Sequence, residues 1–281
     1  MTDPTIERFL PGLACESAVT RGGVAWLRHG TGAPMMLFHG GAGSWNHWAD
    51  NIPSLGRHFS VIGIDSPGYG ASADTDREAA AADYLALVAA AADEILGDAE
   101  SVHVAGFSFG ALAASAVAAH LGRRAAGLTL VGGAGFRRPE RRQLTLQSLR
   151  SLRAELGREP TEAEARRLHA ANLGQLMIWD ERKIDTRAID LQAANVARTR
   201  FDSRPLSWSS TTIENLKRTT CPLQVIYGCH DSSAGADINY RIETCLEIHP
   251  DAEVEVLPAC GHWAMYEAAD IVNELMVDFH A

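Results

Sequence analysis

The sequence lacks the features that mark nucleic-acid-binding and membrane-spanning proteins. It carries 25 Lys and Arg against 35 Asp and Glu, a formal net charge of −10, and no run of five or six basic residues. Such a chain offers no surface for a phosphate backbone or an anionic membrane. No apolar run approaches the roughly 20 residues that span a bilayer, and residues 1–10 carry charges instead of a secretion signal. We therefore expect a cytoplasmic protein that binds neither nucleic acid nor membrane.

Cysteine is scarce and odd in number. The five cysteines form no CxxC pair and no cluster with metal-ligand spacing, so we expect neither a disulfide scaffold nor a metal site. Cys229 and Cys260 lie close in sequence to residues singled out below, and we interpret both as small packing residues. The glycines lack the spacings of dinucleotide-binding and phosphate-binding loops, so no cofactor is predicted.

Short β-type runs bounded by Gly, Pro or Asp alternate with longer helical stretches along much of the chain. This alternation is typical of a mostly parallel sheet covered by helices. The predicted strands span residues 24–27, 35–39, 61–65, 102–106, 128–131, 223–228 and 253–257. The helices predicted from alanine-rich or periodic apolar sequence span residues 77–96, 109–120, 236–249 and 265–279. The length and the 46% hydrophobic content suit one large α/β domain with an insertion.

One interval, residues 137–218, contains no convincing strand. Its sequence favours helices, for example over 161–171 and 185–199, and apolar residues recur through it. We predict a helical lid here, inserted between two parts of the core domain, residues 1–136 and 219–281. Because such helices would expose apolar residues, we also expect that the protein can form a homodimer.

The strongest chemical signal is the sequence Gly106-Phe107-Ser108-Phe109-Gly110, which lies between a predicted strand and a predicted helix. A serine held in a sharp strand-to-helix turn needs small neighbours on both sides, because the backbones pack closely there. Its Oγ then projects above the sheet. Ser108 is therefore the predicted nucleophile.

A serine nucleophile needs a general base and a carboxylate that orients this base. His262 follows the last predicted strand and precedes the last helix, so the fold can bring it to the end of the strand before Ser108. Asp231 follows the penultimate strand, where open α/β sheets place functional loops. Asp237 is the alternative carboxylate. Along the chain, the serine comes first, the aspartate second and the histidine third. This is the order found in triads whose serine lies in a strand-to-helix turn.

The glycine-rich sequence after the strand at residues 35–39 predicts an oxyanion hole. Backbone N–H groups stabilise the negative charge of a tetrahedral intermediate, and glycine lets the backbone approach closely. We assign the N–H groups of Gly41 and Phe109 to this role, with Ala42 one residue away as an alternative to Gly41. Gly40 and Ala42, which flank Gly41, are predicted to line the substrate-binding side.

Taken together, these segments resemble the α/β-hydrolase superfamily over nearly the whole chain. The resemblance rests on His39-Gly40-Gly41, on the Asp65-to-Ser72 segment, on the sequence around Ser108, on Gly228 to Asp231 and on Gly261-His262. It implies the α/β-hydrolase fold, a mostly parallel eight-stranded sheet flanked by helices with a helical lid.

Within the superfamily, the segments that begin at Gly40 and Cys260 look like hydrolases that cleave carbon–carbon bonds in ring-fission (meta-cleavage) products. The resemblance implies substrate contacts for Trp263, which follows the predicted base, and for Arg198, a lid arginine that would hold a substrate carboxylate. These relatives usually carry Asn before the nucleophile, whereas this chain has Phe107, which looks like simple esterases and perhydrolases. We also place Phe107 among the predicted substrate contacts.

The sequence therefore predicts a serine-dependent hydrolase of a small carbonyl compound, either an ester or an activated C–C bond. Two other classes stay open. One is a non-hydrolytic lyase, cyclase or perhydrolase, in which His262 moves protons and Ser108 orients the substrate. The other is a ligand-binding receptor on the same scaffold, because a fold does not fix a function.

Overall fold

A single eight-stranded sheet forms the centre of the molecule in the computed structural model, which describes residues 3–137 and 146–281. The strand order is β1-β2-β4-β3-β5-β6-β7-β8. Strands β1 and β2 pair antiparallel with their neighbours, and the other pairings are parallel. The strands are β1 Glu16–Val19, β2 Ala25–His29, β3 Pro34–Phe38, β4 Ser60–Ile64, β5 Val102–Phe107, β6 Ala125–Val131, β7 Leu223–Gly228 and β8 Glu253–Leu257. The predicted mostly parallel sheet is confirmed.

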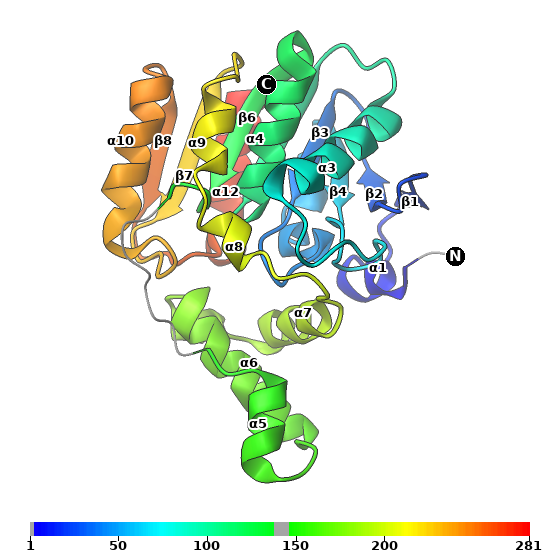
Figure 1. Cartoon of the computed structure of the whole chain (residues 1–281), viewed down its shortest axis with the longest axis vertical. Helices are drawn as coiled ribbons and strands as arrows, with labels where there is room; N and C mark the ends of the chain where they lie inside the picture. The colour runs from blue at the N-terminus through cyan, green and yellow to red at the C-terminus, as the bar shows by residue number, and fades with distance from the viewer. Residues whose placement is uncertain (1–2, 138–145) are drawn as a thin grey trace.

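Helices cover both faces of this sheet, and each face has its own hydrophobic cluster. Helices α3, α4, α9 and α10 lie on one face (Figure 1). Alanines of α4 share a hydrophobic cluster there with residues of the central strands. The opposite cluster contains residues of α1, α2 and α12. These helices span α1 Pro4–Phe9, α2 Ile52–Leu55, α3 Ala81–Leu96, α4 Gly110–Leu121, α9 Thr211–Leu216, α10 Ile238–Ile248 and α12 Ala269–His280.

The last predicted helix is in fact two helices. Helix α11 spans Ala264–Glu267, and α12 begins at Ala269 because Ala268 has φ −131° and ψ 44°, outside the helical region. The break lets α11 follow the His262 loop while α12 packs against the sheet.

Between β6 and β7 the described residues form helices and no strand. We call residues 137–218 the helical insertion; residues 138–145 lie outside the described part of the chain. It contains α5 Leu149–Leu156, α6 Glu162–Leu176, η3 Glu181–Lys183, α7 Thr186–Ala197, α8 Arg204–Ser207 and α9. A capping box of Thr161 and Glu164 starts α6, and the Asp185 side chain caps α7. In Figure 1, α6 and α7 lie below the sheet and α5 lies farthest from it.

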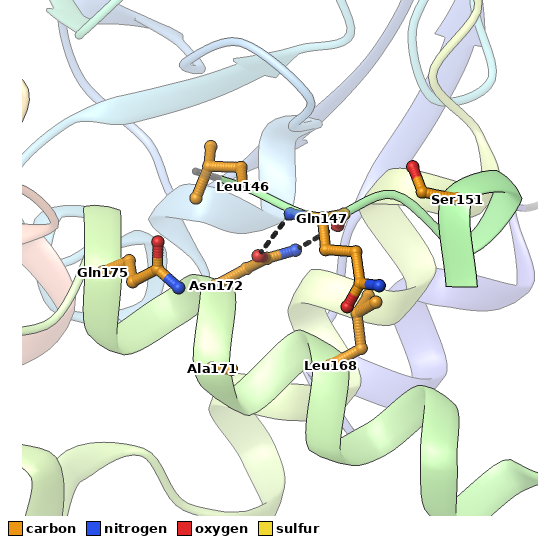
Figure 2. A pocket seen from close by; sticks show the side chains of 7 residues that line it. All are labelled: Leu146, Gln147, Ser151, Leu168, Ala171, Asn172 and Gln175. Carbon is orange, nitrogen blue, oxygen red and sulfur yellow. Dashed lines mark hydrogen bonds between the residues drawn. The ribbon is translucent and has the colours of Figure 1, made fainter. Parts of the chain in front are cut away.

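A cavity of about 380 Å³ lies between α5 and α6, inside the helical insertion (Figure 2). Asn172 of α6 makes two hydrogen bonds to the backbone of Gln147 at this cavity. The Asn172 side-chain oxygen accepts from the Gln147 N–H at 3.2 Å, and the Asn172 Nδ2 donates to the Gln147 carbonyl at 2.7 Å. None of the residues that line this cavity belongs to the predicted triad. Among the described residues, no helix is both long and apolar enough to cross a membrane.

Candidate active site

Ser108 lies in a sharp turn between β5 and α4. Its backbone has φ 52°, an unusual value for a residue other than glycine, and its N–H donates to the Val131 carbonyl at 2.9 Å. The flanking glycines are required by space. A Cβ on Gly106 would lie 2.4 Å from the Gly110 carbonyl oxygen, and a Cβ on Gly110 would lie 2.4 Å from the Phe38 carbonyl oxygen. The turn leaves Ser108 partly exposed.

Three side chains form a hydrogen-bonded relay at this turn. His262 Nε2 lies 2.8 Å from Ser108 Oγ, and His262 Nδ1 lies 2.8 Å from Asp231 Oδ2. His262 is 3% exposed and Asp231 is 1% exposed, so both lie outside bulk solvent. The structure thus brings together the three residues that the sequence predicts as a triad, from the ends of three different strands. The alternative Asp237 instead lies at the N-cap of α10.

Asp231 is held by its own loop as well as by His262. Its Oδ1 accepts from the N–H groups of Ser233 and Ala234, both at 2.8 Å. Burial by itself raises the pKa of this carboxyl, but the His262 imidazole and the Ala234 N–H favour the charged form. The net effect holds the pKa of Asp231 below its ordinary value. The charged carboxylate can therefore accept a hydrogen bond from the Nδ1–H group of His262.

The glycine-rich loop after β3 faces Ser108. Gly40 is buried, and a Cβ there would lie 2.9 Å from the Phe107 ring and 3.2 Å from Ser108 Cβ. Gly41 and Ala42 are partly exposed. Across the described residues, no acceptor is bonded to the backbone N–H of Gly41 or of Phe109, the residue before α4. Two free donors beside a reactive hydroxyl, one of them at a helix N-terminus, can bind an anionic oxygen.

Two of the predicted substrate contacts are buried. Phe107 is 1% exposed, and its ring lies 4.8 Å from the His262 ring, centroid to centroid. Trp263 is wholly buried, stacks on Tyr266 and donates its Nε1–H to the His47 carbonyl at 3.0 Å. Side chains without exposed surface do not touch a ligand in this conformation. Both residues pack around the site and present no surface to a ligand.

Arg198 does not join the relay. Its Nη1 donates to the Asp3 carboxylate at 2.9 Å, and its side chain lines a cavity of about 460 Å³ together with Trp45 and Asp65. Ser108 is not among the residues that line this cavity. The structure does not bring Arg198 to Ser108, and one of its guanidinium nitrogens pairs with a carboxylate of the N-terminal segment. No sequence motif indicates a partner 195 positions away.

Three residues near the site were not predicted. His47 Nδ1 accepts the Gly40 N–H at 3.2 Å, and its ring lies between those of Phe107 and Trp263. Ser203 contributes a hydroxyl from the helical insertion; a Cβ on Gly41 would lie 2.5 Å from its Oγ. Glu267 accepts the Gly261 N–H at 2.6 Å. No motif or spacing in the sequence singles these residues out.

Two buried histidines make the fold sensitive to acid. His39 Nδ1 donates to the Gly40 carbonyl at 2.7 Å, while Nε2 accepts the Ser66 N–H at 3.0 Å, and burial lowers its pKa to about 4. His280, at the end of α12, bonds Thr129 and His103, and burial lowers its pKa to about 3. Both histidines are therefore neutral in the folded protein at neutral pH.

We expect the free energy of unfolding to fall between pH 7 and pH 5. The unfolded chain protonates both histidines near their ordinary pKa of 6.5, whereas the folded protein does not, so acid favours unfolding. Each histidine contributes a loss of about 2 kcal/mol at pH 5. Asp65 opposes this trend, because burial raises its pKa to about 6 and its ionisation above that pH destabilises the fold. Urea unfolding at the two pH values measures the net loss, which should be at least about 2 kcal/mol because burial also lowers the pKa of His47.

Asp65→Asn is the variant that isolates the histidine contribution. It removes the opposing titration, so stability should depend on pH more steeply than in the unmodified protein, whatever its absolute stability. A free energy of unfolding that stays level or rises from pH 7 to pH 5 would show that these histidines titrate normally in the folded state.

Comparison with known proteins finds relatives that match most of this chain. A dihydrolipoyllysine-residue acetyltransferase component of an acetoin cleaving system from Pseudomonas putida is 29% identical, over 88% of this chain and 63% of that protein. The chain therefore spans less than two thirds of this relative. A 2-hydroxy-6-oxononadienedioate/2-hydroxy-6-oxononatrienedioate hydrolase from a Pseudomonas species is 26% identical, over 88% of this chain and 87% of that enzyme.

Solved structures share the fold. The meta-cleavage product hydrolase of Pseudomonas fluorescens superimposes with a TM-score of 0.68 at 22% identity, covering 95% of this chain and 97% of that one. The naproxen esterase of Bacillus subtilis superimposes with a TM-score of 0.75 at 20% identity, covering 99% and 96%. The predicted resemblance to ring-fission product hydrolases and esterases is confirmed. A model of the alpha/beta hydrolase family matches residues 35–275, which is most of the chain, and the protein therefore belongs to that family.

Proposed function

We propose that this protein hydrolyses a small carbonyl compound, with Ser108 as nucleophile, His262 as general base and Asp231 orienting the base. The relay of two 2.8 Å contacts through His262 is the observation that supports this most directly. A serine hydroxyl is a weak nucleophile by itself. It becomes reactive when an adjacent imidazole takes its proton and a carboxylate stabilises the imidazolium that forms.

The reaction begins with attack of Ser108 Oγ on the substrate carbonyl while His262 Nε2 takes the hydroxyl proton. The resulting oxyanion lies at the free N–H groups of Gly41 and Phe109. The bond to the leaving group then breaks, and His262 returns the proton to that group. Water, deprotonated by the same imidazole, attacks the acyl-enzyme, the bond from the acyl carbon to Ser108 Oγ breaks, and His262 returns the proton to Oγ as the acid is released. Each step leaves Asp231 ionised.

Among carbonyl substrates, the described site favours a neutral ester. Arg198, the predicted partner of a substrate carboxylate, is paired with Asp3 instead. An anionic dienoate would lose its hydration without gaining a partner there, which costs free energy. The relatives leave both classes open, since one is named as a dienedioate hydrolase and another as an esterase.

We propose that the helical insertion, residues 137–218, serves as a lid over this site through α5, α6 and α7, with residues 1–136 and 219–281 as the catalytic core. Helix α9, at the end of the insertion, instead packs against α4 on the sheet face. Ser203 supports the assignment, because it brings a hydroxyl of the insertion against Gly41. The insertion also touches both loops of the relay: Ser232 Oγ donates to the Leu176 carbonyl at 2.8 Å, and the Trp263 N–H donates to the Met177 carbonyl at 2.7 Å.

Two measurements on the intact protein test the proposed function. A serine-directed phosphonate should add one phosphonyl group, which peptide mass spectrometry finds on Ser108 and which the Ser108→Ala variant does not acquire. Steady-state kinetics with p-nitrophenyl acetate and with a ring-fission dienoate should give a kcat/KM at least about tenfold higher for the ester, the ratio that a 1.4 kcal/mol difference produces.

The results separate the competing functions. A higher kcat/KM for the dienoate would overturn the preference for neutral esters but leave the triad in place. Turnover without labelling of Ser108 would point to lyase or cyclase chemistry through His262. Retention of an unreacted ester over many turnover times would identify a receptor and refute hydrolysis.

A further inference from the structure

Glu267 holds two distant segments of the chain with one carboxylate. It is 3% exposed, at the end of α11. Its Oε2 accepts the Gly261 N–H at 2.6 Å, and its Oε1 accepts the N–H groups of Trp179 at 3.1 Å and of Asp180 at 2.9 Å. Gly261 precedes the proposed base His262, whereas Trp179 and Asp180 belong to the helical insertion.

These bonds are strong and leave little freedom. Hydrogen bonds to an ionised carboxylate are about twice as strong as those between neutral groups, and a buried carboxylate without partners is costly. The space is also filled: a Cβ on Gly261 would lie 2.6 Å from Glu267 Oε2 and 2.7 Å from the Trp179 nitrogen. A displacement of either segment therefore removes partners from the carboxylate that holds the other.

The same segment of the insertion also touches the loop of Asp231. The Trp179 indole stacks on the His230 ring, with centroids 4.1 Å apart and planes 5° apart. Lys183 adds a bond from η3 to the Glu267 carbonyl. The insertion thus contacts the neighbours of both His262 and Asp231, and Glu267 is the side chain whose carboxylate joins the insertion to the His262 loop.

We propose that Glu267 is a positioning residue that couples the helical insertion to His262. The insertion, through Trp179 and Asp180, fixes the carboxylate, and the carboxylate fixes Gly261 and so the height of His262 above Ser108. A shift of the insertion during substrate entry then alters the alignment of the base. The proposal rests on the proposed function, since it assigns His262 the role of base.

Glu267→Gln tests the coupling. The substitution preserves shape, but its NH2 group cannot accept a hydrogen bond, so it releases either Gly261 or the Trp179–Asp180 pair. Because a small misplacement of a catalytic group is costly, we expect kcat for ester hydrolysis to fall roughly ten- to a hundredfold while KM changes less than about threefold. Glu243→Gln, the same change at an exposed position of α10, should leave both values unchanged.

Amide hydrogen exchange measures the coupling without any substrate. We expect Trp179→Ala, which removes the stack on His230, to speed exchange at the Gly261 amide by about tenfold or more. In a Glu267→Gln background the same change should have less than about a twofold effect, because the link through the carboxylate is already broken.

Three results would overturn the proposal: an unchanged kcat in Glu267→Gln, equal effects of Trp179→Ala in both backgrounds, or no effect in either. If Glu267→Gln does not fold, the exchange of Gly261 in Trp179→Ala alone decides. Failure of the proposed function looks different, because the protein would turn over no ester while the exchange measurements still report whether the segments are coupled.

Discussion

Replacing Ser108 with alanine should lower kcat/KM for ester hydrolysis by about 10⁴-fold or more. The variant loses the Oγ that attacks the carbonyl, and His262 then has no hydroxyl 2.8 Å from its Nε2 to deprotonate. The fold should survive, because Ala42 shows that this chain already holds an alanine at a similar φ of 51°. Residual turnover would come from the oxyanion hole and from water activated by His262.

Ser115→Ala is the matched control for this prediction. It removes a buried hydroxyl of α4 that donates to the Leu112 carbonyl at 3.2 Å, two turns from the proposed nucleophile. We expect kcat/KM near that of the unmodified protein and a loss of stability of about 2 kcal/mol, because the hydroxyl also accepts from Asn215 Nδ2 at 3.1 Å and two hydrogen bonds are lost. If Ser108→Ala kept more than about a tenth of the activity, Ser108 would not be the nucleophile.

Asp231→Asn should lower kcat by about 10³- to 10⁴-fold while the protein stays folded. The Asn Oδ1 can keep the bonds from Ser233 and Ala234 at 2.8 Å, but its NH2 group then faces His262 Nδ1. This donor makes Nδ1 the acceptor and places the imidazole proton on Nε2, where it can no longer take a proton from Ser108. The loss should appear in kcat measured over the neutral pH range.

Asp237→Asn separates the two carboxylates that the sequence offers. Because Asp237 lies at the start of α10 and Asp231 contacts His262, we expect kcat of Asp237→Asn to stay within about twofold of the unmodified value. The reverse order of effects, with Asp237→Asn the more damaging, would mean that the relay in solution uses the other carboxylate.

The centre of the fold could be predicted from the sequence because residue patterns indicate where the backbone forms strands and turns. The strands β3 to β7 are mainly apolar runs bounded by turn residues, β8 alternates Glu with apolar residues, and Ser108 lies where spacing, glycines and a strand–helix boundary agree. Strand β1 was missed because Glu16–Val19 is short and mostly exposed, without the apolar content of a buried strand. The break at Ala268 was missed because alanine favours helices, and tertiary packing overrides that preference.

The surroundings of the relay depend on contacts that sequence patterns do not encode. Whether Phe107 and Trp263 face a ligand or the core is decided by how the loops of His47 and His262 pack together. The position of the Arg198 guanidinium depends on its ion pair with Asp3. The role proposed for Glu267 depends on the backbone N–H groups of Trp179 and Asp180. Such pairings join residues that are far apart in the chain, so no local motif announces them.

The position of the helical insertion has an evolutionary consequence. Strands β6 and β7 are parallel neighbours in the sheet, with Leu128 beside Leu223 and Val131 beside Ile226, so the chain leaves at the carboxyl end of β6 and returns, by the crossover that includes α9, to the amino end of β7. A segment closed in this way can change in length at a small cost in loop entropy. Substrate range can then diverge among descendants while the sheet and relay stay constant, within the limit that any new insertion must still offer Glu267 its N–H partners.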